Sequence, residues 1–228
     1  MDSDLSLYWK SFIDKVEKRS FINSTRVKDD KYEGKPVTFF SGAKSNSIQV
    51  IERQYSISLP DTYKSFMEIS NGMKLFDDFR LLPIEQVTLL KDMDEVISDI
   101  IDLWSTGDIT DEDWNDQNYT PDEYHTFYNR KGTQVDANGY PKHRLPKEQP
   151  VKLQYLDSLI VIGIGGESYS LCLNPNIKTK GNEFEVWYIG SKEDTFRPRF
   201  LNFQEAVTYF FTEHSNWIAA PPSIGLVD

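Results

Sequence analysis

The sequence predicts an α+β fold, in which an antiparallel sheet of about four to six strands carries helices packed mainly on one face. Amphipathic helical periodicity recurs near the N-terminus, in the middle and near the C-terminus of the chain. Between about 151 and 190, apolar and polar residues alternate instead, as they do in half-buried strands. These strands are joined by short turn-like segments, so we expect a meander of at least three antiparallel strands.

The first predicted helix spans 5–21, and one of its faces is apolar while the opposite face is charged. The apolar stripe consists of Leu5, Tyr8, Trp9, Phe12, Ile13 and Val16. A stripe with this spacing is typical of contact with a core. The chain then turns polar from 23 to 46, with Gly42 among its breaks and a possible short edge strand at 35–40.

The stretch 47–72 predicts two short helices joined by a tight link. Ile48, Ile51 and Tyr55 share one face of the first helix. Pro60 suits the first turn of the second helix, with Ser58 as its cap, and Asn71-Gly72 suits its end. Helices this short need other elements to cover. The stretch therefore predicts a scaffold, and it does not predict a reaction.

A strand and a turn at Pro83 are expected within 75–87, followed by a third amphipathic helix at 92–104 that ends at 105–107. Its predicted apolar face is Met93, Val96, Ile97, Ile100 and Ile101. Its predicted solvent face is Asp94, Glu95, Asp99 and Asp102. After the strands, 202–213 predicts a closing helix with a capping box, and the tail from about 219 is expected to be loose.

Segment 107–128 is rich in acidic and aromatic residues and contains no Lys or Arg. It fits a solvated acidic helix, a partly disordered loop, or an acidic patch with aromatic anchors that docks a basic protein. The candidate partner-binding residues are Asp108, Asp111, Glu112, Asp113, Trp114, Asp116 and, in the turn after the glycine-rich run, Glu167. Segment 131–150 reads as a loop that is locally basic.

Two sequence motifs carry a family resemblance. The first motif consists of Ile48, Ile51, Glu52, Leu59, Pro60, Tyr63, Lys64, Phe66, Asn71 and Gly72, and the second is Leu81-Leu82-Pro83-Ile84-Glu85. With Leu201-Asn202-Phe203 near the end, their order and spacing resemble the SUKH superfamily, which includes Smi/Knr-type cell-wall regulators and many bacterial toxin-immunity proteins. The resemblance implies one SUKH-like domain over 1–228, with an acidic insertion at about 91–150.

Composition narrows the possible partners. The chain has 36 Asp and Glu against 25 Lys and Arg, a net charge of −11, which disfavours nucleic acid and anionic membranes. Cys172 is the only cysteine, no signal peptide is visible, and no apolar run is long enough for a membrane span. We therefore expect a cytoplasmic protein of unknown oligomeric state.

No pattern for catalysis, a cofactor or a metal stands out. Gly163-x-Gly165-Gly166 fits a turn better than a dinucleotide fingerprint, and the three histidines lack metal-ligand spacing. We expect that the protein is not an enzyme and that it binds no cofactor and no metal. The resemblance and the charge predict a binding protein that neutralises a basic toxin domain, for example a nuclease. The alternatives are a regulatory or scaffold module without a toxin, and a hydrolase, which would need a pocket holding paired acids or a His–acid pair.

Overall fold

A computed structural model of the chain describes residues 3–26, 37–75, 79–110, 152–165, 169–190 and 199–213. The helices are α1 (Ser3–Arg26), α2 (Ser45–Gln54), α3 (Asp61–Ile69), α4 (Leu90–Met93), α5 (Glu95–Thr106) and α8 (Phe203–Glu213), with short 3-10 turns η1 (Ile84–Gln86) and η2 (Leu153–Ser158). The expected N-terminal, paired, third and closing helices are thus all present.

The strands form one antiparallel sheet. They are β1 (Val37–Phe39), β2 (Met73–Leu75), β3 (Phe79–Leu81), β4 (Thr88–Leu89), β5 (Ile160–Gly165), β6 (Tyr169–Lys178), β7 (Phe184–Gly190) and β8 (Arg199–Phe200). Their order is β1-β2-β3-β5-β6-β7-β8, and β4 pairs with β5. The α+β class and the antiparallel sheet are confirmed. The described sheet has eight strands where we expected four to six, because strands of two or three residues are too short to show alternation.

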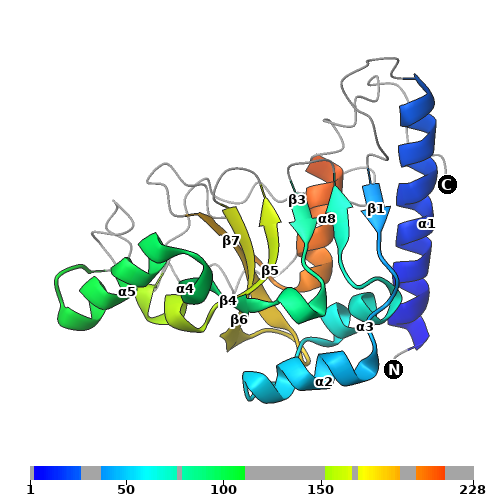
Figure 1. Cartoon of the computed structure of the whole chain (residues 1–228). Helices are drawn as coiled ribbons and strands as arrows, with labels where there is room; N and C mark the ends of the chain where they lie inside the picture. Colours follow the sequence, from blue (N-terminus) through cyan, green and yellow to red (C-terminus); the bar gives the residue numbers. More distant parts are fainter. Residues whose placement is uncertain are drawn as a thin grey trace.

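Helices cover both faces of the sheet (Figure 1). On one face, α1, α2, α3 and α8 pack over a core that includes Ile160, Ile162 and Leu173. On the other face, α4, α5 and η2 pack over a core that includes Val161 and Cys172. The alternation of Ile160, Val161 and Ile162 between the two cores is the period of two that a strand requires. Most helices lie on one face, as expected, and the smaller second layer was not anticipated.

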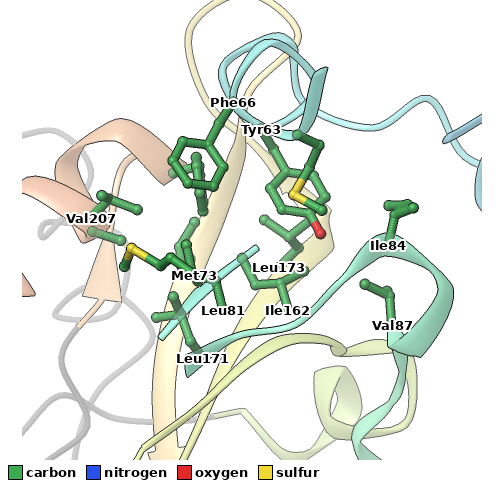
Figure 2. Close-up of a cluster of buried hydrophobic side chains, with 14 of the residues drawn as sticks. Tyr63, Phe66, Met73, Leu81, Ile84, Val87, Ile162, Leu171, Leu173 and Val207 are labelled. Atoms are coloured by element: carbon green, nitrogen blue, oxygen red, sulfur yellow. The ribbon is translucent and has the colours of Figure 1, made fainter. Parts of the chain in front are cut away.

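Aromatic side chains form the centre of the first core. The Trp9 ring from α1 meets the Phe66 ring from α3 with centroids 5.1 Å apart and the Phe203 ring from α8 with centroids 5.7 Å apart. The Trp9 indole Nε1 donates a hydrogen bond to the carbonyl oxygen of Thr62 at 3.0 Å. Figure 2 shows Phe66 above the apolar side chains of the sheet, with Val207 of α8 beside them. The stripe predicted on the first helix therefore does face the core.

The first half of the glycine-rich run, from Gly163 to Gly165, belongs to a strand and not to a turn. Gly163 and Gly165 lie within β5, and 166–168 fall outside the described residues. A Cβ on Gly165 would lie 2.5 Å from the Tyr188 hydroxyl oxygen and 3.0 Å from Cδ2 of Phe79. Gly165 thus makes room for the rings of Phe79 on β3 and Tyr188 on β7, and Gly163 is in close contact with Leu81 and Leu171. These contacts account for the two glycines without a nucleotide.

None of the described helices combines the length and the hydropathy that crossing a bilayer requires.

Candidate functional site

The link between α2 and α3 is held by charged side chains of the first sequence motif. Glu52 Oε1 accepts a hydrogen bond from the backbone N–H of Leu59 at 2.9 Å and lies 3.4 Å from the ammonium of Lys64. That ammonium is also 3.4 Å from Asp61 Oδ1. One carboxylate therefore bridges the end of the link and the first turns of α3, and this fixes the angle between the two helices.

Helix α2 ends in a left-handed turn made by a residue other than glycine. Ser56 has φ +54°. The N–H of Ile57 donates to the Glu52 carbonyl at 2.9 Å, and the N–H of Ser56 donates to the Arg53 carbonyl at 3.3 Å. These two bonds are those of a Schellman motif, in which glycine is the usual residue at the left-handed position.

The N-terminus of α3 is capped from a distant part of the chain. The Glu183 carboxylate, between β6 and β7, accepts the N–H of Thr62 at 2.9 Å and its hydroxyl at 2.5 Å. The pKa of Glu183 is raised, chiefly by burial, although the hydrogen bonds from Thr62 act to lower it. The expected cap by Ser58 is wrong: Pro60 is the N-cap residue without a side-chain bond, and the Ser58 hydroxyl lies 3.4 Å from the amide nitrogen of Asn182.

The two sequence motifs bind each other through Asn71. Its Oδ1 accepts the N–H of Ile84 at 2.8 Å, and its Nδ2 donates to Glu85 Oε2 at 2.9 Å. This hydrogen bond is the main reason why the pKa of Glu85 is lowered. Next to it, Gly72 has φ +94°, and a Cβ there would lie 2.6 Å from the Leu81 carbonyl oxygen. The segments 71–72 and 81–85 are therefore held together by hydrogen bonds and by a close approach of their backbones.

The contacts between these two motifs agree with a comparison of the sequence with models of known families. The model of the SMI1 / KNR4 family (SUKH-1) matches residues 42–208, which is more than half of the chain. The chain belongs to this family. A comparison with curated proteins gives no match.

In this member of the SMI1 / KNR4 family, the motif residues that carry the resemblance are mainly structural. Glu52, Lys64 and Asn71 bond to the chain itself, and Tyr63 and Phe66 are buried. A side chain that is already engaged inside the fold is poorly placed to bind a partner. The functional surface of this family member must therefore be sought among residues outside the motifs.

Of the seven predicted partner-binding residues, the structure describes Asp108. It is exposed directly after α5, where its Oδ2 accepts the Thr106 hydroxyl at 2.6 Å. The others lie outside the described residues: Asp111, Glu112, Asp113, Trp114, Asp116 and Glu167. Whether they form one patch stays a prediction.

An acidic row next to Asp108 was not chosen as a site from the sequence. Glu95, Asp99 and Asp102 are exposed on α5 at positions i, i+4 and i+7, so they share one side of the helix. Residues 92–108 contain no Lys or Arg. Asp94 has another role, because its Oδ1 caps α5 by accepting the N–H groups of Val96 at 3.0 Å and Ile97 at 3.2 Å.

Four large apolar side chains of α4 and α5 are exposed, and two of them, Val96 and Leu103, share the side of α5 that carries Asp99. The exposed fractions are 40% for Met93, 49% for Val96, 45% for Leu103 and 37% for Trp104. The expectation that Met93 and Val96 are on the buried face is wrong, since the buried residues of α5 are Ile97 and Ile100. Met93 belongs to α4, which the extended Asp94 separates from α5, and Val96 is about 100° around the helix from Ile97.

We call Val96 and Leu103, together with the acids Glu95, Asp99 and Asp102, the α5 surface. Trp104 is left out because it lies on the side of the helix that carries Ile97 and Ile100. The spacing that reveals the α5 surface was present in the sequence: Val96 and Leu103 are seven residues apart with Asp99 between them. The predicted site was instead placed on the longer acidic run that begins at Asp108. Exposed aliphatic side chains beside charged ones are compatible with a protein interface, which has an apolar centre and a polar rim.

The described residues offer little chemistry elsewhere. Within the described ranges, no three His, Cys, Asp or Glu side chains are grouped as metal ligands. Cys172 is buried, and burial raises the pKa of its thiol far above the ordinary value, so the thiol stays protonated and is a poor nucleophile. The α5 surface is thus the best candidate site, and what it can do is attract and contact another macromolecule.

Proposed function

We propose that this member of the SMI1 / KNR4 family is a non-enzymatic binding protein of the immunity type, which neutralises a cognate toxin by binding it and occluding its active surface. The family is consistent with this role. The observation that carries the proposal is the α5 surface, where an acidic row adjoins exposed apolar side chains.

The physical reason is complementarity of charge. A nuclease toxin must be basic where it meets phosphate, so an acidic protein can occupy the same surface. A net charge of −11 and the row Glu95, Asp99 and Asp102 would accelerate the encounter with such a partner, above all at low salt. Asp108 extends the acidic side chains past the end of α5.

The other predicted contacts belong to this proposal as an extension. Asp111, Glu112, Asp113, Trp114 and Asp116 follow Asp108 in the sequence, and we propose that they add to the steering charge. Glu167 is the weakest of the proposed contacts, since it lies far from the others in the sequence and is proposed from its charge alone.

The test is to express the chain together with the product of its neighbouring gene in host cells. We expect the two proteins to co-purify, and we expect the chain to relieve growth inhibition by that product. A triple variant Glu95→Gln, Asp99→Asn and Asp102→Asn should associate more slowly, with the largest difference at low salt. Its matched control is Asp14→Asn, Glu17→Gln and Asp157→Asn, which removes three exposed acids from α1 and η2.

The alternative is a regulatory or scaffold module of the cell-wall-regulator type, without a toxin partner. In that case the neighbouring gene product would not inhibit growth, and the chain would bind a protein that has no toxic activity. Turnover of a small compound by the purified chain would overturn both non-enzymatic functions.

A further inference from the structure

We infer that the apolar part of the α5 surface is a docking site for a protein whose apolar recess is rimmed by Lys and Arg. The inference rests on the proposed function for the class of partner, and it goes further by naming the chemistry of the surface that the partner must present. It is carried by Val96 and Leu103, whereas the proposed function is carried by the acids.

The docking residues are held in a fixed arrangement before any partner arrives. Val96 and Leu103 are two helical turns apart, with Asp99 between them on the same side. Ile97 and Ile100 anchor the helix in the second core. The helix is capped at its start by Asp94 and at its end by Gly107, which has φ +83°. A rigid helix loses little conformational entropy when it binds.

The exposure of these side chains is too great for core residues. Val96 is 49% exposed and Leu103 is 45% exposed. Isolated exposed apolar residues are ordinary, but Val96 and Leu103 lie two turns apart on one side of α5, so they form a short apolar strip that a partner can cover.

Charge decides which occupant fits. A second copy of this chain would bring Glu95, Asp99 and Asp102 against their own counterparts, and the repulsion opposes such a dimer. Nucleic acid and anionic lipid are repelled by the same carboxylates. A protein surface with cations around an apolar recess complements the whole α5 surface. The recess buries Val96 and Leu103, and the cations on its rim pair with the acids.

The acidic and the apolar side chains of the α5 surface are expected to act on different rate constants. Exposed acids act at long range and mainly raise the association rate, with a strong dependence on salt. Buried apolar contacts act only after docking and mainly slow dissociation. Substitutions of Val96 and Leu103 should therefore change residence time at every salt concentration, and substitutions of the acids should not.

The experiment uses the full chain and a synthetic helix–loop–helix peptide that presents a Leu-lined groove between two rows of Lys. Binding is followed by fluorescence anisotropy of the labelled peptide and mapped by amide resonances. We expect Val96→Ser with Leu103→Ser to weaken binding about tenfold or more at all salt concentrations. The matched control is Leu7→Ser with Val50→Ser, which removes two apolar side chains that are 65% and 46% exposed on α1 and α2; it should bind as the wild type does.

Equal binding of the peptide by the Val96→Ser, Leu103→Ser variant and by the control would overturn the inference. A wild-type dimer in light scattering that the same substitutions dissociate would also overturn it, because the occupant would then be a second copy. If the neighbouring gene product binds and keeps its residence time on the variant, the inference fails and the proposed function stands. If that product is harmless while the peptide behaves as expected, the toxin assignment fails and the docking surface stands.

Discussion

The Glu183 carboxylate accepts the backbone N–H of Thr62 at 2.9 Å, and the two residues are 121 positions apart in the sequence. The bond joins the turn between β6 and β7 to the first turn of α3. It also places a negative charge at the positive end of that helix dipole. The family motif at the start of α3 therefore depends on a residue that belongs to neither motif.

Glu183→Ala should destabilise the protein by about 1–2 kcal/mol, as the loss of an N-terminal cap does. Glu183→Gln should cost much less, because an amide oxygen still accepts the Thr62 N–H. Urea denaturation at pH 7 measures both. A fold that tolerates Glu183→Ala without loss would show that the cap is dispensable.

The same pair predicts a dependence on pH. Burial raises the pKa of Glu183 in the folded state, so the folded chain holds this proton more tightly than the unfolded chain. Its contribution to the free energy of unfolding is full below the unfolded pKa of about 4.3, and it is lost as the pH rises through the raised value. Glu183→Gln should lack this component, and denaturation at several pH values compares the two proteins.

Ser56→Gly should stabilise the protein by about 1 kcal/mol. Ser56 has φ +54°, a conformation that costs an L-residue energy and costs glycine almost none. The measurement is the midpoint of thermal or urea unfolding. Ser58→Gly is the control, because Ser58 is also exposed but has no positive φ, so it should bring no gain. Equal effects of the two substitutions would refute the explanation by strain.

The long elements and their faces followed from sequence because each repeats its period several times. The alternation in β6 and the stripe of α1 are examples, whereas β4, with two residues, shows no pattern. In the sequence, Gly42 indicated only a break in a loop. In the structure, glycine is needed there because the backbone of α3 lies against it. The Glu183 cap left no local signal, since a bond across 121 residues has none.

The sequence predicted the acidic character of the candidate site but not its position on α5. An acidic surface was expected, and its acids at 95, 99 and 102 were expected to face water, which they do. The neighbouring Val96 was assigned to the core because a hydrophobic stripe in sequence can be wider than the surface that the fold covers. Apolar residues at the edge of such a stripe are therefore where sequence cannot separate core from interface.

Tyr63→Phe should leave stability unchanged or raise it by up to about 1 kcal/mol. The Tyr63 hydroxyl is buried and finds no hydrogen-bond partner among the described residues, and burial raises its pKa far above the ordinary range. Removing a buried polar group that lacks a partner removes a desolvation cost. Tyr8→Phe is the contrast: its hydroxyl lies 3.2 Å from that of Thr208, so its loss should cost about 0.5–1.5 kcal/mol. A larger loss for Tyr63→Phe than for Tyr8→Phe would contradict this account.

Gly42→Ala should destabilise the protein by about 1–3 kcal/mol, as overpacking does. A Cβ at Gly42 would overlap the carbonyl oxygen of Glu68 in α3, and the backbone on both sides of Gly42 is bonded to this region. The N–H of Ala43 donates to the Met67 carbonyl at 2.7 Å, and Ser41 accepts the N–H of Asn71 at 3.1 Å. Gly107→Ala separates clash from strain, since Gly107 has φ +83° and a Cβ there would meet nothing within 4 Å. It should cost about 1 kcal/mol, and a cost at Gly42 no greater than this would argue against the clash.

Asn71→Asp should destabilise the protein by about 1 kcal/mol at pH 7, because the new carboxylate cannot donate to Glu85 and faces it as a like charge. The exposure of Glu85 keeps the cost small. The Asn71 hydrogen bond lowers the pKa of Glu85, so in the wild type this contribution is present above the unfolded pKa and is lost as the pH falls through the folded value. The difference between the two proteins should therefore shrink in acid. Adding Glu85→Gln should restore most of the loss, because its amide can donate to Asp at 71; a double variant no more stable than Asn71→Asp would mean that the two motifs are joined by other contacts.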